Sequence, residues 1–178
     1  YDIPTGIYEP VLYGYRSTAL LDISPDGKEL LLGLYTKDWQ HTPFDETTLL
    51  RYTPATGKVD TIFSREIEIA QAYFIPGTED ILVTGSPNSF KGVGNVLPDG
   101  RTGNGYQHEL FRVNSSTGKV TPLTRDFDPT VEQLQYHAKS KSFYILADNG
   151  SRQSLFRLDV KTNKIHAIDA KEDVVRGF

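Results

Sequence analysis

Three stretches of the chain share one ungapped frame: LRYTPATGKV at residues 50–59, FRVNSSTGKV at residues 111–120 and FRLDVKTNKI at residues 156–165. Each begins with an apolar residue, an arginine and a second apolar residue. Turn-forming residues follow, and then a lysine and a β-branched residue. Gly57, Gly118 and Asn163 occupy the same place in the turn, and Gly and Asn tolerate a left-handed backbone best. The frame therefore predicts a β-hairpin in each copy.

A second hairpin precedes each copy. Its turns are SPDG at residues 24–27, PGTE at residues 76–79 and AKSK at residues 138–141. The strands that return from these turns contain the apolar runs 30–32, 81–83 and 143–146. Continuous apolar runs are typical of strands buried on both faces. Each unit thus has four short strands in meander order, which is one blade of a β-propeller.

We predict an all-β chain, a partial β-propeller of about three four-stranded antiparallel blades in a single segment, residues 1–178. The expected parts are blades at residues 17–64, 67–124 and 131–169, and a lead into a further blade at residues 170–178. The alternative is a β-sandwich of two or three hairpins. A sandwich rarely repeats one turn at fixed intervals, so the shared frame favours the propeller.

The spacing of the repeat supports the blades. Arg51 and Arg112 are 61 residues apart, whereas Arg112 and Arg157 are 45 apart. Blades are typically about 40–50 residues long, so the shorter interval is the repeat. An insertion at residues 87–106, rich in Gly and Asn, accounts for the difference. Long loops in compact domains are often functional, although a surface excursion without a role is the simpler interpretation.

The composition excludes several classes of protein. Of the 178 residues, 38% are hydrophobic and 24% charged, which is typical of globular rather than disordered chains. The net charge is −4 and no basic stripe is present, so we expect no nucleic-acid partner. Without cysteine there is no disulfide, thiolate nucleophile or Cys-ligated zinc. No apolar run approaches the roughly 18 residues of a membrane-spanning helix, so we expect no membrane partner.

Two sets of motifs resemble known families. SPDGK at residues 24–28 resembles the signature of TolB-like and peptidase propellers. More specific are GSPNSFKGVG at residues 85–94, ELFRV at residues 109–113 and TGKVTPLTRDFDPTV at residues 117–131. These are similar to the N-terminal propeller of bacterial serine peptidases of the prolyl oligopeptidase / dipeptidyl peptidase IV family. The resemblance covers residues 17–170.

The resemblance implies the non-catalytic propeller portion of a serine exo- or oligopeptidase, periplasmic or secreted. Its partners would be the α/β-hydrolase domain of the same parent chain and peptide substrates, which the propeller gates and positions. The chain departs from the family because it has no G-x-S-x-G nucleophile elbow. It also begins at Tyr1 and contains no Met, so we interpret it as a mature piece or an excised segment. The alternative is a TolB-like scaffold for protein or ligand binding, with no associated enzyme.

We expect no catalytic residue, cofactor or metal in this segment. The family's adjacent glutamates, which hold the substrate amino terminus, are missing. Glu66 and Glu68 are separated by Ile67 and are predicted to point to one face of a strand, so that role is not transferred. Asp126 and Asp128 could serve as paired acids, but they lie between predicted blades, where acids usually cap turns.

The remaining motifs are weaker. The histidines fall in different predicted elements and lack metal-ligand spacing; they are His41, His108, His137 and His166. Residues 99–105, DGRTGNG, resemble a calcium loop, but Arg101 occupies a ligand position. Residues 92–94, GVG, lack the third glycine of a dinucleotide fingerprint. Asn114 and Asn149 match the glycosylation pattern, yet Asn is also a common turn residue.

The first and last blade of the array each have only one neighbouring blade. Three blades cannot close a ring with ordinary geometry, and the first and last blade of an open array each leave one face bare. In the last repeat we expect these bare residues to be Phe143, Ile145, Leu155 and Leu158. The chain is therefore expected to self-associate through its end blades or to be one piece of a longer polypeptide.

Overall fold

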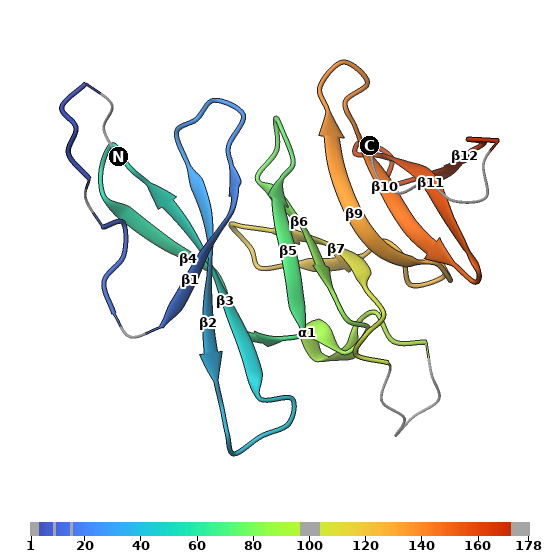
Figure 1. Ribbon diagram of the computed structural model, residues 1–178, viewed down its shortest axis with the longest axis horizontal. Coiled ribbons are helices and arrows are strands. Elements are labelled where there is room, and N and C mark those ends of the chain that lie inside the picture. The colour runs from blue at the N-terminus through green and yellow to red at the C-terminus, as the bar shows by residue number, and fades with distance from the viewer. Residues whose placement is uncertain (1–3, 9, 15, 97–103, 172–178) are drawn as a thin grey trace.

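The computed structural model describes residues 4–8, 10–14, 16–96 and 104–171, which form three four-stranded antiparallel sheets (Figure 1). Blade one contains β1 (Ser17–Ile23), β2 (Leu30–Lys37), β3 (Asp45–Thr53) and β4 (Lys58–Ile67). Blade two contains β5 (Ile69–Phe74), β6 (Asp80–Gly85), β7 (Glu109–Asn114) and β8 (Val120–Pro122). Blade three contains β9 (Thr130–His137), β10 (Ser142–Asn149), β11 (Arg152–Asp159) and β12 (Ile165–Ile168). Each sheet pairs its strands in chain order, and the predicted fold class is confirmed.

The three sheets stand side by side, with blade two between the other two (Figure 1). Alternate residues of a strand face opposite sides of its sheet. Accordingly, Ile81 and Val83 of β6 pack with Leu31 and Leu49 of blade one, whereas Leu82 packs with blade three. The apolar core thus consists of two layers, one between each pair of neighbouring blades.

The prediction of the bare residues on blade three is wrong for most of its members. Phe143, Ile145 and Leu158 are buried in the layer shared with blade two. Leu155 pairs with Leu146, which alternation places on the opposite face of the sheet. The apolar pattern shows that the strand has two faces, but it does not show which face meets the neighbouring blade.

The turn frame holds in all three copies. Gly57, Gly118 and Asn163 have φ angles of 67°, 70° and 58°, so the predicted left-handed conformations are confirmed. Each donates its backbone N–H to the carbonyl four residues earlier, at 2.9, 2.9 and 2.8 Å. The same closed turn therefore joins the third and fourth strand of every blade.

Replacing the turn glycines tests this account of the frame. No atom lies within 4 Å of a Cβ built on Gly57 or Gly118, so the substitutions meet no clash. We expect Gly57→Ala and Gly118→Ala each to lower the free energy of unfolding by about 1 kcal/mol, because alanine disfavours positive φ. Urea denaturation measures the change. Ala55→Gly, in the same turn at a residue without positive φ, is the control and should not stabilise the protein. Unchanged midpoints for both alanine variants would contradict the prediction.

Candidate functional site

Two cavities lie at one end of the blades. Because turns alternate between the two ends of a meander, the β2–β3 hairpin, the β6–β7 connection and the β8–β9 connection share an end. Figure 1 shows the first two of these at its lower edge. Loops at one end of a rigid scaffold are where binding residues concentrate. A binding site is therefore expected at this end.

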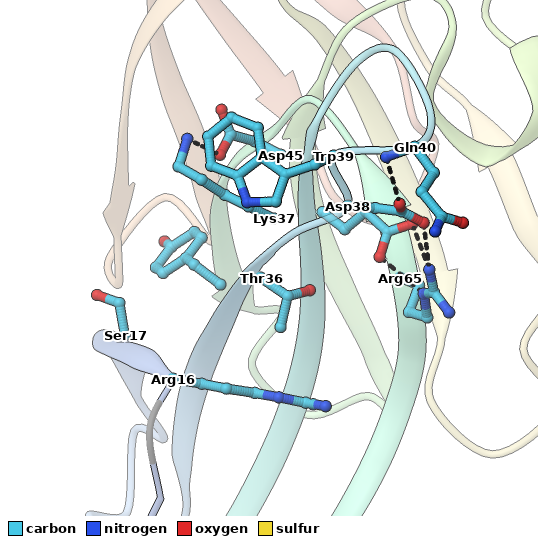
Figure 2. Close-up of a pocket in the computed structure, with 11 residues that line it drawn as sticks. Arg16, Ser17, Thr36, Lys37, Asp38, Trp39, Gln40, Asp45 and Arg65 are labelled. Atoms are coloured by element: carbon cyan, nitrogen blue, oxygen red, sulfur yellow. Dashed lines mark hydrogen bonds and ion pairs between the residues drawn. The ribbon is translucent and has the colours of Figure 1, made fainter.

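The larger cavity, the hairpin cleft, has a volume of about 780 Å³ (Figure 2). It is open to solvent and lies beside the β2–β3 hairpin of blade one. Its lining consists of residues 16–17, 35–40, 45–46 and 65. These residues come from the start of β1, the hairpin strands and the end of β4, so the cleft depends on the pairing of the whole sheet.

Arg65 holds one side of the hairpin cleft in place. Its Nε donates to Glu46 Oε2 at 2.7 Å, and its Nη2 donates to Asp38 Oδ2 at 2.9 Å (Figure 2). Asp38 also accepts the backbone N–H of Gln40 at 2.9 Å and lies 3.0 Å from His41 Nδ1. The hydrogen bond from the Gln40 N–H, and to a smaller extent the one with His41, lowers the pKa of Asp38 below its usual value. Both acids of this side therefore pair with the same guanidinium.

The other side of the cleft presents an aromatic ring. Trp39 is 72% exposed and its ring lies 5.6 Å from that of Phe44. Lys37 Nζ lies 5.4 Å from the Trp39 ring centroid and 2.7 Å from Asp45 Oδ1. Lys37, which is paired with Asp45, therefore contacts the Trp39 ring and still leaves most of it exposed to solvent. An exposed tryptophan of this kind is typical of contact surfaces.

Arg16 supplies a cation to the same cleft. Figure 2 shows its side chain extended across the lower part of the cleft, beneath Thr36. Within the described part of the chain, its guanidinium makes no hydrogen bond and no ion pair. A free guanidinium can bind a carboxylate or several carbonyl oxygens. The cleft thus combines an apolar plane, a free cation and acids that are already neutralised.

Residues 65–68 connect this cleft with blade two. Glu66 Oε2 accepts the backbone N–H of Phe90 at 2.9 Å, and Glu68 accepts Ser86 Oγ and, at 3.3 Å, Asn88 Nδ2. The prediction that Glu66 and Glu68 lie on one face of a strand is wrong, because β4 ends at Ile67 and Glu68 has a φ of 54°. Burial raises the pKa of Glu66. Both carboxylates serve to hold the start of the insertion.

The insertion begins with a distorted turn, α1 (Ser89–Gly92). Phe90 and Lys91 inside it have φ angles of 54° and 62°, so it is not a regular helical turn. Together with Arg65 and Glu68, these residues place four left-handed, non-glycine conformations in two neighbouring segments. Each such conformation is unfavourable, and they cluster at functional sites. The contacts of the two glutamates fix this strained backbone beside the cleft.

The second cavity, the insertion cavity, has a volume of about 550 Å³. It lies between the insertion, the start of β7 and the β8–β9 connection. Asp126 and Asp128, the predicted pair of acids, both line it, and so do Arg125 and Glu109. Phe127 donates its N–H to the Thr124 carbonyl at 2.7 Å. Asp126 and Asp128 therefore lie on a turn and not on one face of a strand.

Glu109 is a buried carboxyl group at the wall of the insertion cavity. It is 4% exposed, and it accepts the Thr124 hydroxyl and, at 3.2 Å, Gln107 Nε2. Burial raises its pKa from 4.5 to about 7, against the opposing effect of Thr124. A carboxyl group in this state exchanges its proton near neutral pH.

The other residues considered from the sequence do not come together. His41 contacts Asp38, His108 Nδ1 lies 3.3 Å from the Val131 carbonyl, and His137 Nδ1 lies 2.9 Å from Ser140 Oγ. No group of three or more metal-ligating side chains forms within the described ranges. In the same ranges, no helix has the length and apolar character to cross a bilayer. Most of the predicted loop at residues 99–105 lies outside the described residues.

No motif or repeat in the sequence indicated Arg16, Trp39 or Glu109 as a site residue. Trp39 is the single tryptophan of the chain, and it sits between two strands of a repeat, where a large aromatic is not needed for a turn. That position could have marked it as a contact residue. Arg16 and Glu109 offered no such feature, because their roles depend on neighbours far away in the sequence.

No protein-family model matches the chain, and no curated protein matches it. Among solved structures it is similar to TolB from Acinetobacter baumannii, with 18% identity and a TM-score of 0.59 over 92% of this chain and 35% of that one. It is also similar to the β-propeller domain of the Trilobed protease from Pyrococcus furiosus, with 14% identity and a TM-score of 0.56 over 86% of this chain and 39% of that one. The fold is that of a β-propeller. This chain spans little more than a third of the length of either structure.

Titration of Glu109 should be visible in the stability of the protein. Burial favours the neutral acid, so the folded state binds the proton more tightly than the unfolded chain between pH 4.5 and about 7. The contribution of Glu109 is therefore full below pH 4.5 and is lost as the pH rises to about 7. A loss on the order of 3 kcal/mol is expected, because a tenfold shift in a protonation equilibrium is about 1.4 kcal/mol.

Glu109→Gln isolates this effect, since the amide stays neutral and can still accept from Thr124. At pH 4 the variant should match the parent chain in urea denaturation, and at pH 8 it should be the more stable protein. Asp126→Asn, at an exposed acid of the same cavity, is the control. A stability difference between Glu109→Gln and the parent that does not vary with pH would contradict the prediction.

Proposed function

We propose that this segment is the non-catalytic propeller portion of a serine exo- or oligopeptidase, and that its hairpin cleft binds and positions peptide substrates. The α/β-hydrolase domain that would cleave them belongs to the same parent chain, in the periplasm or outside the cell. The observation that carries the proposal is that the exposed indole of Trp39 and the guanidinium of Arg16, which makes no ion pair within the described residues, line the same cleft. The motifs of residues 85–94 and 117–131 and the likeness to a protease's propeller domain support it.

The chemistry of the cleft fits a polypeptide. Peptide side chains supply apolar groups that stack on an indole, which is the commonest kind of contact hot spot. Peptide carbonyls or a terminal carboxylate accept from a guanidinium such as that of Arg16. The acids Asp38 and Glu46 are already bound to Arg65 and therefore do not repel such an acceptor.

A TolB-like scaffold that binds protein or ligand without an associated enzyme is the second candidate. The likeness to TolB over 92% of this chain favours it. The two candidates differ in whether the parent polypeptide carries a hydrolase domain after the propeller. A G-x-S-x-G motif, with Asp and His further on in the encoded polypeptide, separates the peptidase from the scaffold.

Because Trp39 is the only tryptophan, its fluorescence reports binding at the hairpin cleft alone. A mixture of tryptophan-free heptapeptides should shift the emission to shorter wavelength and reduce quenching by acrylamide, because a bound peptide shields the indole. Arg16→Ala should weaken this binding by about tenfold, the effect of losing one charge-assisted hydrogen bond. Arg125→Ala, in the insertion cavity, is the matched control and should leave it unchanged.

An oligosaccharide mixture is the control for the ligand, and it should not alter the emission. The proposal of peptide binding fails if the heptapeptides leave both emission and quenching unchanged up to about 1 mM, a concentration that corresponds to about −4 kcal/mol of binding free energy. It also fails if Arg16→Ala and Arg125→Ala weaken binding equally.

A further inference from the structure

Arg16 carries the one unpaired charge in the lining of the hairpin cleft. The other charged side chains of the lining form ion pairs of 2.7–2.9 Å, which are Lys37 with Asp45 and Arg65 with both Asp38 and Glu46. Within the described ranges, Arg16 forms neither an ion pair nor a hydrogen bond. The charge that the cleft offers to a ligand is therefore positive, and a guanidinium binds a carboxylate through charge-assisted hydrogen bonds.

Arg16 also lines a neighbouring cavity of about 400 Å³. The segment before β1 covers part of the sheet of blade one here, and its Leu12 lines the cavity together with Leu34 and Leu50, so we call it the leucine cavity. Thr36 lines the hairpin cleft two residues after Leu34 in β2, and alternation places both on one face of the sheet. Among the described residues, Arg16 alone lines both cavities, so it lies where they meet.

The C-terminal residue of a peptide fits this arrangement. It carries a carboxylate and a side chain on the same Cα, so one residue can place an anion on the guanidinium and an apolar group in the leucine cavity. An internal aspartate or glutamate fits less well, because in an extended peptide the neighbouring side chains point to the opposite side. From Arg16 the remaining residues of the peptide can follow the cleft toward Trp39, which Figure 2 shows at the other end.

We propose that the hairpin cleft selects peptides by their C-terminal residue, with Arg16 binding the free carboxylate and the leucine cavity accepting an apolar side chain of that residue. This selectivity rests on the proposed function, in which the cleft binds peptides. It also disfavours a basic C-terminal residue, because the acids of the cleft are already paired and Arg16 repels a second cation.

Calorimetric titration of the full chain with a set of heptapeptides tests this selectivity. The peptides share six residues with uncharged side chains and differ at the seventh. The peptide that ends in leucine with a free carboxylate should bind most tightly. Amidation of its carboxylate should weaken binding by about tenfold, as expected for the loss of one charge-assisted hydrogen bond. Replacement of the leucine by serine should also weaken binding by about tenfold, because the apolar side chain is lost.

Two further arms assign the carboxylate to its source and to its partner. A peptide with an internal glutamate and an amidated end should bind no better than the amidated leucine peptide. Arg16→Gln should bind the free acid and the amide equally well. Arg125→Gln, the same change in the insertion cavity, is the matched control and should keep the difference between them. Far-ultraviolet circular dichroism confirms that both variants are folded.

The outcomes separate this selectivity from peptide binding itself. If the peptides bind but either amidation or the change to serine leaves the affinity unaltered, the selectivity is wrong and peptide binding stands. The same holds if Arg16→Gln still prefers the free acid, or if the internal glutamate peptide binds as tightly as the free acid. If no peptide binds up to about 1 mM, the proposed function fails and the selectivity fails with it.

Discussion

The structure depends on the apolar contacts that blade two makes on both of its faces. Leu82 and Val83 are adjacent in β6 and fully buried, yet they belong to different core layers. Burying apolar area is the main stabilising contribution, at about 25 cal/mol per Å², and both core clusters are formed by residues of two neighbouring blades. Blades one and three therefore acquire their stability from blade two, and the loops at their ends are positioned only when all three sheets are packed.

The link between blades one and two shows how this packing shapes the candidate site. A single residue, Glu68, separates β4 from β5, so the chain must reverse within one left-handed conformation. Next to this link, Arg65 donates to Glu46 in the hairpin of blade one, and Glu66 accepts the backbone N–H of Phe90 in the insertion. Phe90 in turn packs edge-on between Phe63 and Phe111, with ring centroids 5.2 Å from each. One short segment thus supports the cleft, the insertion and the first core layer together.

Local chemistry explains why the sequence predicted the blades and their turns. Gly57 and Asn163 mark left-handed positions wherever they occur, and an apolar run indicates a buried strand without any tertiary information. The site is different, because Arg16, Asp38 and Arg65 line one cleft only after β1, β2, β3 and β4 have paired into one sheet. Glu68 was misplaced for a related reason: its left-handed conformation follows from the short link between two sheets and not from its own preference. The faces of blade three were misassigned because alternation is symmetric between the two sides of a strand.

Arg51 and Arg112 have the same place in the repeated frame, but they form hydrogen bonds and ion pairs of different strength in their two blades. Arg112 has an acid at 2.6 Å and two acceptors on blade three, and charge-assisted hydrogen bonds are typically worth about 1.5–3 kcal/mol each. Arg51 has acids only at 3.7–3.9 Å, and its buried Nε has no hydrogen-bond partner among the described residues. The frame places a guanidinium between blades in both cases, but the acid at the start of the second strand decides how firmly it is held. Of the two arginine bridges, the one between blades two and three is therefore the more firmly held. The contact between blades one and two has other bonds, among them the one that the Phe74 N–H donates to Asp22 Oδ2 at 2.8 Å.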